Sequence, residues 1–199
     1  MSDKETEELQ AFVFKNRGAI LSLPAVLLAG CGKPSALSIS VGLPLAFAGE
    51  AIRAWAVGYS GVTTRGDHVE APGLVTAGPY AHVRNPLYVG NFITALGFAL
   101  AFTGKNTPLQ RACLIGASLG TMAAVYATII PHEEQFLRSE FGEAFERYCS
   151  VVPPLIPLRE PQGGGVGAYD PGVIAQAESK TFLSFGAMLA VLALRAIKA

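Results

Sequence analysis

The sequence is poor in charge. Only 15% of its 199 residues are Asp, Glu, Lys or Arg, whereas 51% are hydrophobic. A typical soluble domain carries about 25% charged residues, so too few charges remain here to coat a water-soluble globule. Composition therefore predicts an integral membrane protein.

The sequence also lacks a basic surplus and paired cysteines. Lys and Arg together number 15, equal to Asp and Glu. Binding to a nucleic-acid backbone needs an excess of cations, so nucleic acid is not an expected partner. Cys31, Cys113 and Cys149 do not have the spacing of a zinc site or a disulfide framework. We expect no bound metal.

Apolar runs define the expected helices. A membrane-spanning helix needs about 20 mostly apolar residues, and residues 85–104 and 112–131 fit that length. Upstream, residues 18–32 and 36–58 are predicted to form a helical hairpin. The run 181–194 would rise only about 21 Å. The expected fold is an all-α membrane helical bundle with four transmembrane helices plus a possible fifth.

Two amphipathic helices are predicted beside this bundle. Residues 8–15 place Leu9, Phe12 and Val13 on one helical face. A second apolar stripe follows helical spacing and predicts one continuous helix; it consists of Leu137, Phe141, Phe145 and Tyr148. We expect both helices at the cytosolic membrane face.

The chain is predicted to have a core and a C-terminal extension. Residues 1–160 would form the membrane core, and residues 161–199 a glycine-rich linker followed by an apolar helix. With five crossings, the N-terminus and the loops 59–84 and 132–180 share one side, which holds nine of the fifteen basic residues. That bias predicts a cytoplasmic location for this side.

A first polar cluster precedes the third apolar run. Within residues 74–88, Pro79 and Pro86 interrupt helical structure. Several backbone groups are thereby left to face a ligand. The alternative is an ordinary proline turn that leads into a helix.

A second polar cluster follows the fourth apolar run. Glu133 and Glu134 are adjacent carboxylates that can bind a ligand ammonium group. Taken alone, acidic residues in a first helical turn more often complement the helix dipole. A zinc-binding His-Glu-x-x-His motif is absent, because Phe136 stands where the second histidine would be.

A charged pair lies within the run 36–58. Glu50 and Arg53 are three residues apart, so they can pair across one helical turn. Ionisable residues in a span are candidates for function, but structural pairing is the favoured interpretation because it needs no ligand.

The two polar clusters together resemble a known family. Gly73 to Gly90 reads GLVTAGPYAHVRNPLYVG, and an apolar hairpin then leads to Glu133, Glu134 and the segment 141–157. This order resembles the isoprenylcysteine carboxyl methyltransferase and phospholipid methyltransferase superfamily over residues 40 to 158. The resemblance implies S-adenosylmethionine as methyl donor, bound at the cytosolic face. We expect the plasma (inner) membrane.

The resemblance also implies roles for individual residues. Arg84 and Glu134 are the expected catalytic residues. The residues expected to bind the cofactor are Leu74, Val75, Tyr80, Asn85, Pro86, Leu87, Tyr88 and Glu133. Glu133 would meet the ammonium group of the donor, and Tyr80 or Tyr88 would present an aromatic face to its sulfonium. No general base is evident; His82 and Glu134 are candidates.

Two departures from the family pattern leave the methyl acceptor open. Asn85 replaces the motif's histidine, and Ile129 stands where the prenylcysteine enzymes carry an arginine for the substrate carboxylate. The acceptor can thus be a carboxylate, a thiol or an amine on a small or lipophilic molecule, including a membrane lipid. Two other functions stay open: an NADPH-dependent protein like the sterol reductases, and a non-catalytic membrane scaffold.

Overall fold

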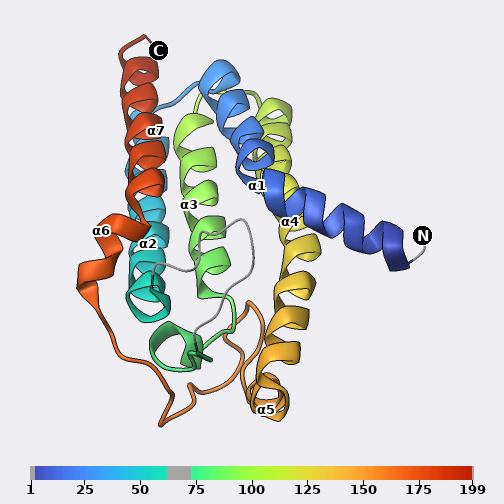
Figure 1. Cartoon of the computed structure of the whole chain (residues 1–199). Coiled ribbons are helices and arrows are strands. Elements are labelled where there is room, and N and C mark those ends of the chain that lie inside the picture. The colour runs from blue at the N-terminus through green and yellow to red at the C-terminus, as the bar shows by residue number, and fades with distance from the viewer. Residues whose placement is uncertain (1–2, 62–72, 199) are drawn as a thin grey trace. The chain divides into compact units, whose positions relative to one another are not determined.

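The computed structural model describes residues 3–61 and 73–198 (Figure 1). The loop predicted over residues 59–84 therefore lies partly outside the described residues. The helices are α1 (Asp3–Cys31), α2 (Ala36–Ser60), η2 (Gly78–Ala81), α3 (Pro86–Phe102), α4 (Pro108–Phe141), α5 (Glu143–Val151), η3 (Pro171–Val173), α6 (Ile174–Ala177) and α7 (Ser179–Lys198). The described part of the chain contains no strand, and the all-α class is confirmed.

Within the described residues, four helices are long and apolar enough to cross a membrane, as expected of an integral membrane protein. They are Glu8–Cys31 within α1, α2, α4 and α7. The helix whose crossing was left open is one of these four, because α7 extends the 14-residue apolar run to 20 residues, a rise of about 30 Å. The shorter apolar helix is α3, with 17 residues.

Two predicted helix boundaries differ from the structure. Helix α1 is continuous from Asp3 to Cys31, so residues 8–15 belong to the same helix as the first span; Figure 1 shows a bend along it. The prediction of one helix through residues 137–148 is wrong. Gly142 has a φ of +50°, a conformation open mainly to glycine, and it separates α4 from α5. The apolar stripe persists across this break, since Leu137 and Phe141 pack against the buried Phe145 and Tyr148.

The chain folds into two compact units. The scaffold unit comprises Met1–Gly49, Phe92–Ile129 and Thr181–Ala199. The polar unit comprises Glu50–Asn91 and Ile130–Lys180. The predicted division into a core up to residue 160 and an extension stays a prediction.

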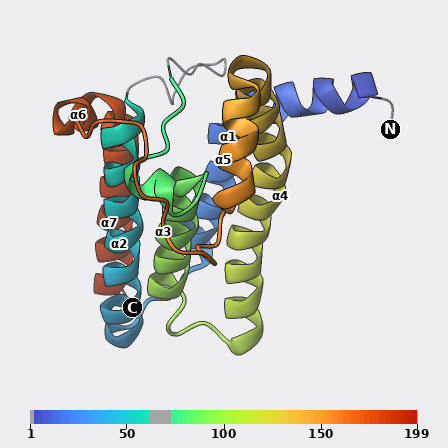
Figure 2. The same cartoon turned by 90° about the horizontal axis from the view of Figure 1, so that it is seen from below.

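The scaffold unit is built on close helix packing. A Cβ atom on Gly97 of α3 would lie 2.3 Å from the backbone nitrogen of Ala46 in α2. Only small residues allow helix backbones to approach this closely, as membrane helices often do. Helix α7 lies along the first half of α2 (Figures 1 and 2), and the rings of Phe47 and Phe185 are 5.0 Å apart.

Candidate functional site

The first polar cluster is a shaped turn that leads into α3. Pro79 is the second residue of the short helix η2, and Pro86 is the first residue of α3; a missing N–H costs nothing in the first turn of a helix. We call residues 153–170 the return segment. Its carbonyls at Pro153 and Pro154 accept hydrogen bonds from the backbone N–H groups of Arg84 and Asn85, at 2.9 and 3.1 Å. The two proline-containing stretches therefore hold each other in place.

The structure brings the two polar clusters together within the polar unit. The Tyr88 hydroxyl donates a hydrogen bond of 2.7 Å to the Glu133 carboxylate. Tyr88 belongs to the first turn of α3, and Glu133 lies in the part of α4 that continues beyond Pro131. An aromatic residue of the first polar cluster thus contacts an anion of the second.

The expected catalytic residues, Arg84 and Glu134, form an ion pair. Both Nε and Nη2 of Arg84 lie 2.9 Å from Oε1 of Glu134. The side chains are only 12% and 15% exposed, and Arg84 Nη1 also donates to the Val152 carbonyl at 2.7 Å. Arg84 therefore links the turn before α3 to α4 and to the end of α5.

Tyr80, in the helix η2, interacts electrostatically with Glu133 of the second polar cluster and with Arg53. Its pKa is raised to about 12, mainly because burial disfavours the charged phenolate, and the Glu133 carboxylate contributes to the rise. A hydrogen bond with Ser60 and the charge of Arg53 act in the opposite direction. Tyr80 is a neutral phenol with an electron-rich ring at physiological pH.

Tyr148 of α5 fixes the backbone of this turn. Its hydroxyl donates to the Tyr80 carbonyl at 2.7 Å, and burial raises the pKa of Tyr148 as well. Leu74 packs against the cluster of Phe145, Tyr148 and Val152. Helix α5 thus supports the first polar cluster from one side.

The return segment covers the turn along a second side. The backbone N–H groups of Thr76 and Ala77 donate to the Val166 carbonyl at 2.9 and 3.1 Å. A Cβ atom on Gly167 would lie 3.1 Å from the Val75 side chain. Figure 2 shows this segment, in orange, running beside the green turn that contains η2. The glycine-rich stretch, predicted to be a flexible linker, is thus hydrogen-bonded to the site turn.

The remaining predicted cofactor residues lie where the turn meets α3. The Asn85 amide donates to the Pro154 carbonyl at 3.2 Å, so the residue that replaces the family's histidine points its amide at the return segment. Pro86 is buried and Leu87 is half-buried in the first turn of α3. The ring of His82, a candidate base, packs edge-on against Trp55 at a centroid distance of 6.0 Å.

A second ion pair was not predicted. The Nη2 atom of Arg53 lies 2.8 Å from both carboxylate oxygens of Glu178, and its Nη1 donates to the Asn91 side-chain oxygen at 2.5 Å. Arg53 is 8% exposed and Glu178 only 1%. The predicted partner, Glu50, is more distant, with 3.9 Å between its Oε2 and Arg53 Nε. Glu178 lies far along the chain in the C-terminal extension, so no spacing in the sequence connected the two.

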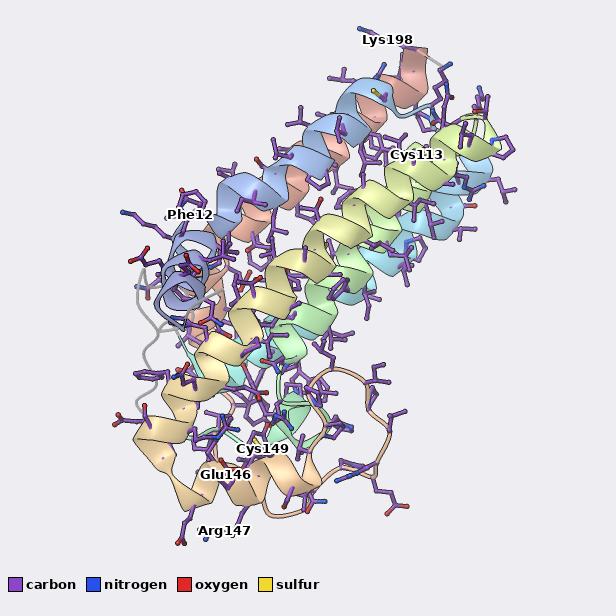
Figure 3. All side chains as sticks on the ribbon, turned by 90° about the vertical axis from the view of Figure 1, so that its right-hand side faces the viewer. Phe12, Cys113, Glu146, Arg147, Cys149 and Lys198 are labelled. Atoms are coloured by element: carbon purple, nitrogen blue, oxygen red, sulfur yellow. The ribbon has the colours of Figure 1, made fainter. Side chains whose placement is uncertain are left out.

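Helix α5 turns one face toward the site. Figure 3 shows Cys149 on the inner side of α5 and Arg147 on its outer side. Burial raises the pKa of the Cys149 thiol. The Cys149 carbonyl accepts a weak hydrogen bond of 3.4 Å from Arg84. Within residues 3–61 and 73–198, no three His, Cys, Asp or Glu side chains are grouped to hold a metal ion.

Comparison with known proteins assigns the family. The model of the phospholipid methyltransferase family matches residues 37–144, more than half of the chain. The chain belongs to the phospholipid methyltransferase family. The matched residues include the turn before α3, the Arg84–Glu134 pair, the Tyr88–Glu133 pair and Arg53, but not Glu178.

Curated relatives match parts of the chain at 32–38% identity. A protein-S-isoprenylcysteine O-methyltransferase of Schizosaccharomyces pombe is 38% identical over 85 residues, which cover 43% of this chain and 33% of the relative. A probable protein-S-isoprenylcysteine O-methyltransferase of Oryza sativa is 32% identical over 124 residues, covering 60% of this chain and 61% of the relative. The cobalt-zinc-cadmium resistance protein CzcN of Cupriavidus metallidurans is 34% identical over 85 residues, covering 42% and 35%. The chain thus spans from a third to about three fifths of the length of these relatives. No solved structure matches it significantly.

Proposed function

We propose that this family member is an S-adenosylmethionine-dependent membrane methyltransferase. The observation that carries the proposal is the meeting of Tyr80, Tyr88 and Glu133 in one compact unit, inside the region that the family model matches. The donor carries an ammonium group, a carboxylate and a sulfonium, so its site needs an anion and an electron-rich aromatic face.

The residues present fit the donor. Glu133 is a carboxylate able to bind the ammonium group by a charge-assisted hydrogen bond, and Tyr88 orients this carboxylate. Tyr80, a neutral phenol, would offer its ring to the sulfonium with a cation–π attraction of about 0.5–2 kcal/mol. Leu74, Val75, Pro86 and Leu87 would supply apolar walls, and Asn85 would hold the return segment against them.

The Arg84–Glu134 pair would act by positioning the site. Arg84 contacts both Glu134 and the Val152 carbonyl, so it fixes the turn before α3 relative to α4 and α5. When bound, S-adenosylmethionine would supply an electrophilic methyl group. The acceptor's lone pair would bond to it and the carbon–sulfur electrons would stay on sulfur; a thiol or amine acceptor would lose its proton to water, whereas a carboxylate has none to lose. Alignment of donor and acceptor with water excluded then provides most of the rate gain.

We further propose a location at the plasma (inner) membrane, with the site facing the cytoplasm. The bias of basic residues toward the loops that carry the site supports this orientation. The acceptor would be a small or lipophilic molecule that reaches the site from the lipid, a membrane lipid among them. The O-methyltransferase names of the relatives support methyl transfer as the reaction class.

A titration of two cofactors tests this function. The purified protein in lipid nanodiscs would be titrated calorimetrically with S-adenosylmethionine and, separately, with NADPH. We expect saturable heat with S-adenosylmethionine alone. Saturable heat with NADPH alone would favour a reductase-like protein, and heat with neither would favour a scaffold; both results would overturn the proposal.

A further inference from the structure

The polar unit contains two guanidinium groups that are largely hidden from solvent, and each is paired with a carboxylate. Arg84 is paired with Glu134, a partner from within the family-matched region. Arg53 is paired with Glu178, which follows that region by more than 30 residues. The Arg53 pair has both carboxylate oxygens 2.8 Å from one guanidinium nitrogen, and Glu178 is almost completely buried.

Among its described residues, the interior of the polar unit holds more acidic than basic side chains. Among its described residues, the buried or half-buried Arg, Lys, Asp and Glu side chains are Glu50, Arg53, Arg84, Glu133, Glu134 and Glu178. Four of these are acids and two are bases. A carboxylate acceptor entering this interior would have to be desolvated beside an excess of negative charge, which is strongly unfavourable without a cation to receive it.

Arg53 is well placed to be that cation. Its Nη1 donates to the Asn91 side-chain oxygen at 2.5 Å, and Asn91 lies three residues after Tyr88 on α3, so the two side chains share one face of that helix. Tyr88 in turn contacts Glu133, the proposed donor anchor. The residue that contacts Arg53 is therefore one helical turn from the residue that contacts the donor anchor, and the charge of Arg53 also acts on the Tyr80 phenol.

We infer that Glu178 determines acceptor specificity by occupying Arg53. The inference rests on the proposed methyltransferase function and narrows its acceptor. Among the described residues of the polar unit, the two largely buried guanidinium groups are then both held by carboxylates, Arg53 by Glu178 and Arg84 by Glu134. Neither is available to an acceptor carboxylate, so the site takes an uncharged nucleophile, a thiol or an unprotonated amine. In the transfer, the sulfur or nitrogen lone pair bonds to the methyl carbon, the carbon–sulfur electrons remain on the donor, and the acceptor proton leaves to water.

The position of Glu178 in the chain supports this role. The family model ends at residue 144, whereas Glu178 lies between α6 and α7. Its helix α6 follows the return segment, in which Asp170 N–H donates to the Gly58 carbonyl at 2.8 Å. The C-terminal stretch that contacts the turn before α3 thus also carries Glu178, the carboxylate that pairs with Arg53.

Octyl compounds with different head groups test the inference. Octanoate binding would be measured calorimetrically in nanodiscs, with empty nanodiscs as the blank, for the wild type, Glu178→Gln, the double variant Arg53→Gln/Glu178→Gln, and the exposed control Glu143→Gln. The amide keeps the shape of Glu178 and removes its charge. We expect Glu178→Gln to bind octanoate at least about 10-fold more tightly than the wild type, a difference of 1.4 kcal/mol.

The other variants should separate the charge effect from a structural one. The double variant Arg53→Gln/Glu178→Gln should not show the gain in octanoate affinity, and Glu143→Gln should bind octanoate as the wild type does. Equal octanoate affinity in Glu178→Gln and the wild type would overturn the inference, as would a gain that survives in the double variant. This binding needs no methyl donor, so it is distinguishable from a failure of the S-adenosylmethionine titration.

Transfer by the wild type provides a test that needs no variant. The protein would be supplied with labelled S-adenosylmethionine and with octanethiol, octylamine or octanoate at equal concentration. We expect methylation of the thiol or the amine to exceed that of octanoate at least about 10-fold. Equal or preferred methylation of octanoate would contradict the role of Glu178, even if Glu178→Gln does not fold.

Discussion

The two units differ in what they bury. The buried polar residues of the scaffold unit are the hydroxyl side chains Ser38, Thr103 and Ser118, each donating to a helix carbonyl at 2.7–2.8 Å. Those of the polar unit are the charged side chains Glu50, Arg53 and Glu178. Buried charges are costly, and packing alone does not need them. The buried polar groups of the scaffold unit are thus satisfied within its helices, whereas the polar unit buries charges, which in a membrane protein are candidates for function.

The largest predicted effect comes from breaking the buried charge pair. Arg53→Met leaves Glu178 buried without its bidentate partner, which should cost about 3–5 kcal/mol. The double variant Arg53→Met/Glu178→Leu removes both charges and should recover most of this loss. Thermal denaturation in detergent would compare the two. A single variant as stable as the double variant would show that the pair is not energetically coupled.

The next effect concerns the packing of the scaffold unit. Gly97→Ala places a methyl group against the Ala46 backbone, and overpacking of this kind costs about 1–3 kcal/mol. Gly116→Ala is the matched control, because nothing lies within 4 Å of a Cβ atom there. The control should be neutral or gain up to about 1 kcal/mol from helix propensity. Equal melting temperatures for the two variants would contradict the close approach of α2 and α3.

The smallest effect appears only at alkaline pH. The folded state holds the pKa of Tyr80 at about 12, against an ordinary value of 10.0. Between these values the unfolded chain releases the proton while the folded chain retains it, so stability should fall as pH rises from 10 to 12. Tyrosinate absorbance and melting temperature would follow this loss. In Tyr80→Phe, the loss of stability between pH 10 and 12 should be smaller. A loss equal to that of the wild type would show that the pKa of Tyr80 is not raised by folding.

The sequence predicted those parts of the structure that depend on local patterns of apolar and polar residues. Apolar runs predicted the helices, and the family resemblance implied that the two polar clusters would contact one donor molecule. The direct hydrogen bond between Tyr88 and Glu133 was not predicted. Prediction failed where a single backbone conformation decides the outcome, as at Gly142, whose positive φ ends α4. It also missed Glu178, because its contact with Arg53 spans 125 residues. The three-residue spacing of Glu50 and Arg53 instead favoured Glu50 as the partner of Arg53, but Glu50 lies farther from Arg53 than Glu178 does.

The length of α7 shows a related limit. The run 181–194 was counted only to its last apolar residue, whereas the helix includes Ser179, Lys180 and the residues through Lys198. Polar residues at helix ends extend a span because their side chains can reach the membrane surface. In α7, Arg195 stands in the last turn and donates to the Ala29 carbonyl at 2.7 Å.

The affinity of the Glu133→Gln variant for S-adenosylmethionine tests the central claim most directly. This change keeps the hydrogen bond available to Tyr88 but removes the charge proposed to bind the donor ammonium. Such charge-assisted contacts contribute about 1.5–3 kcal/mol, so calorimetry should show about 10- to 100-fold weaker binding. Glu140→Gln, an exposed change on the same helix, should bind like the wild type. Equal affinities for Glu133→Gln and the wild type would contradict the account.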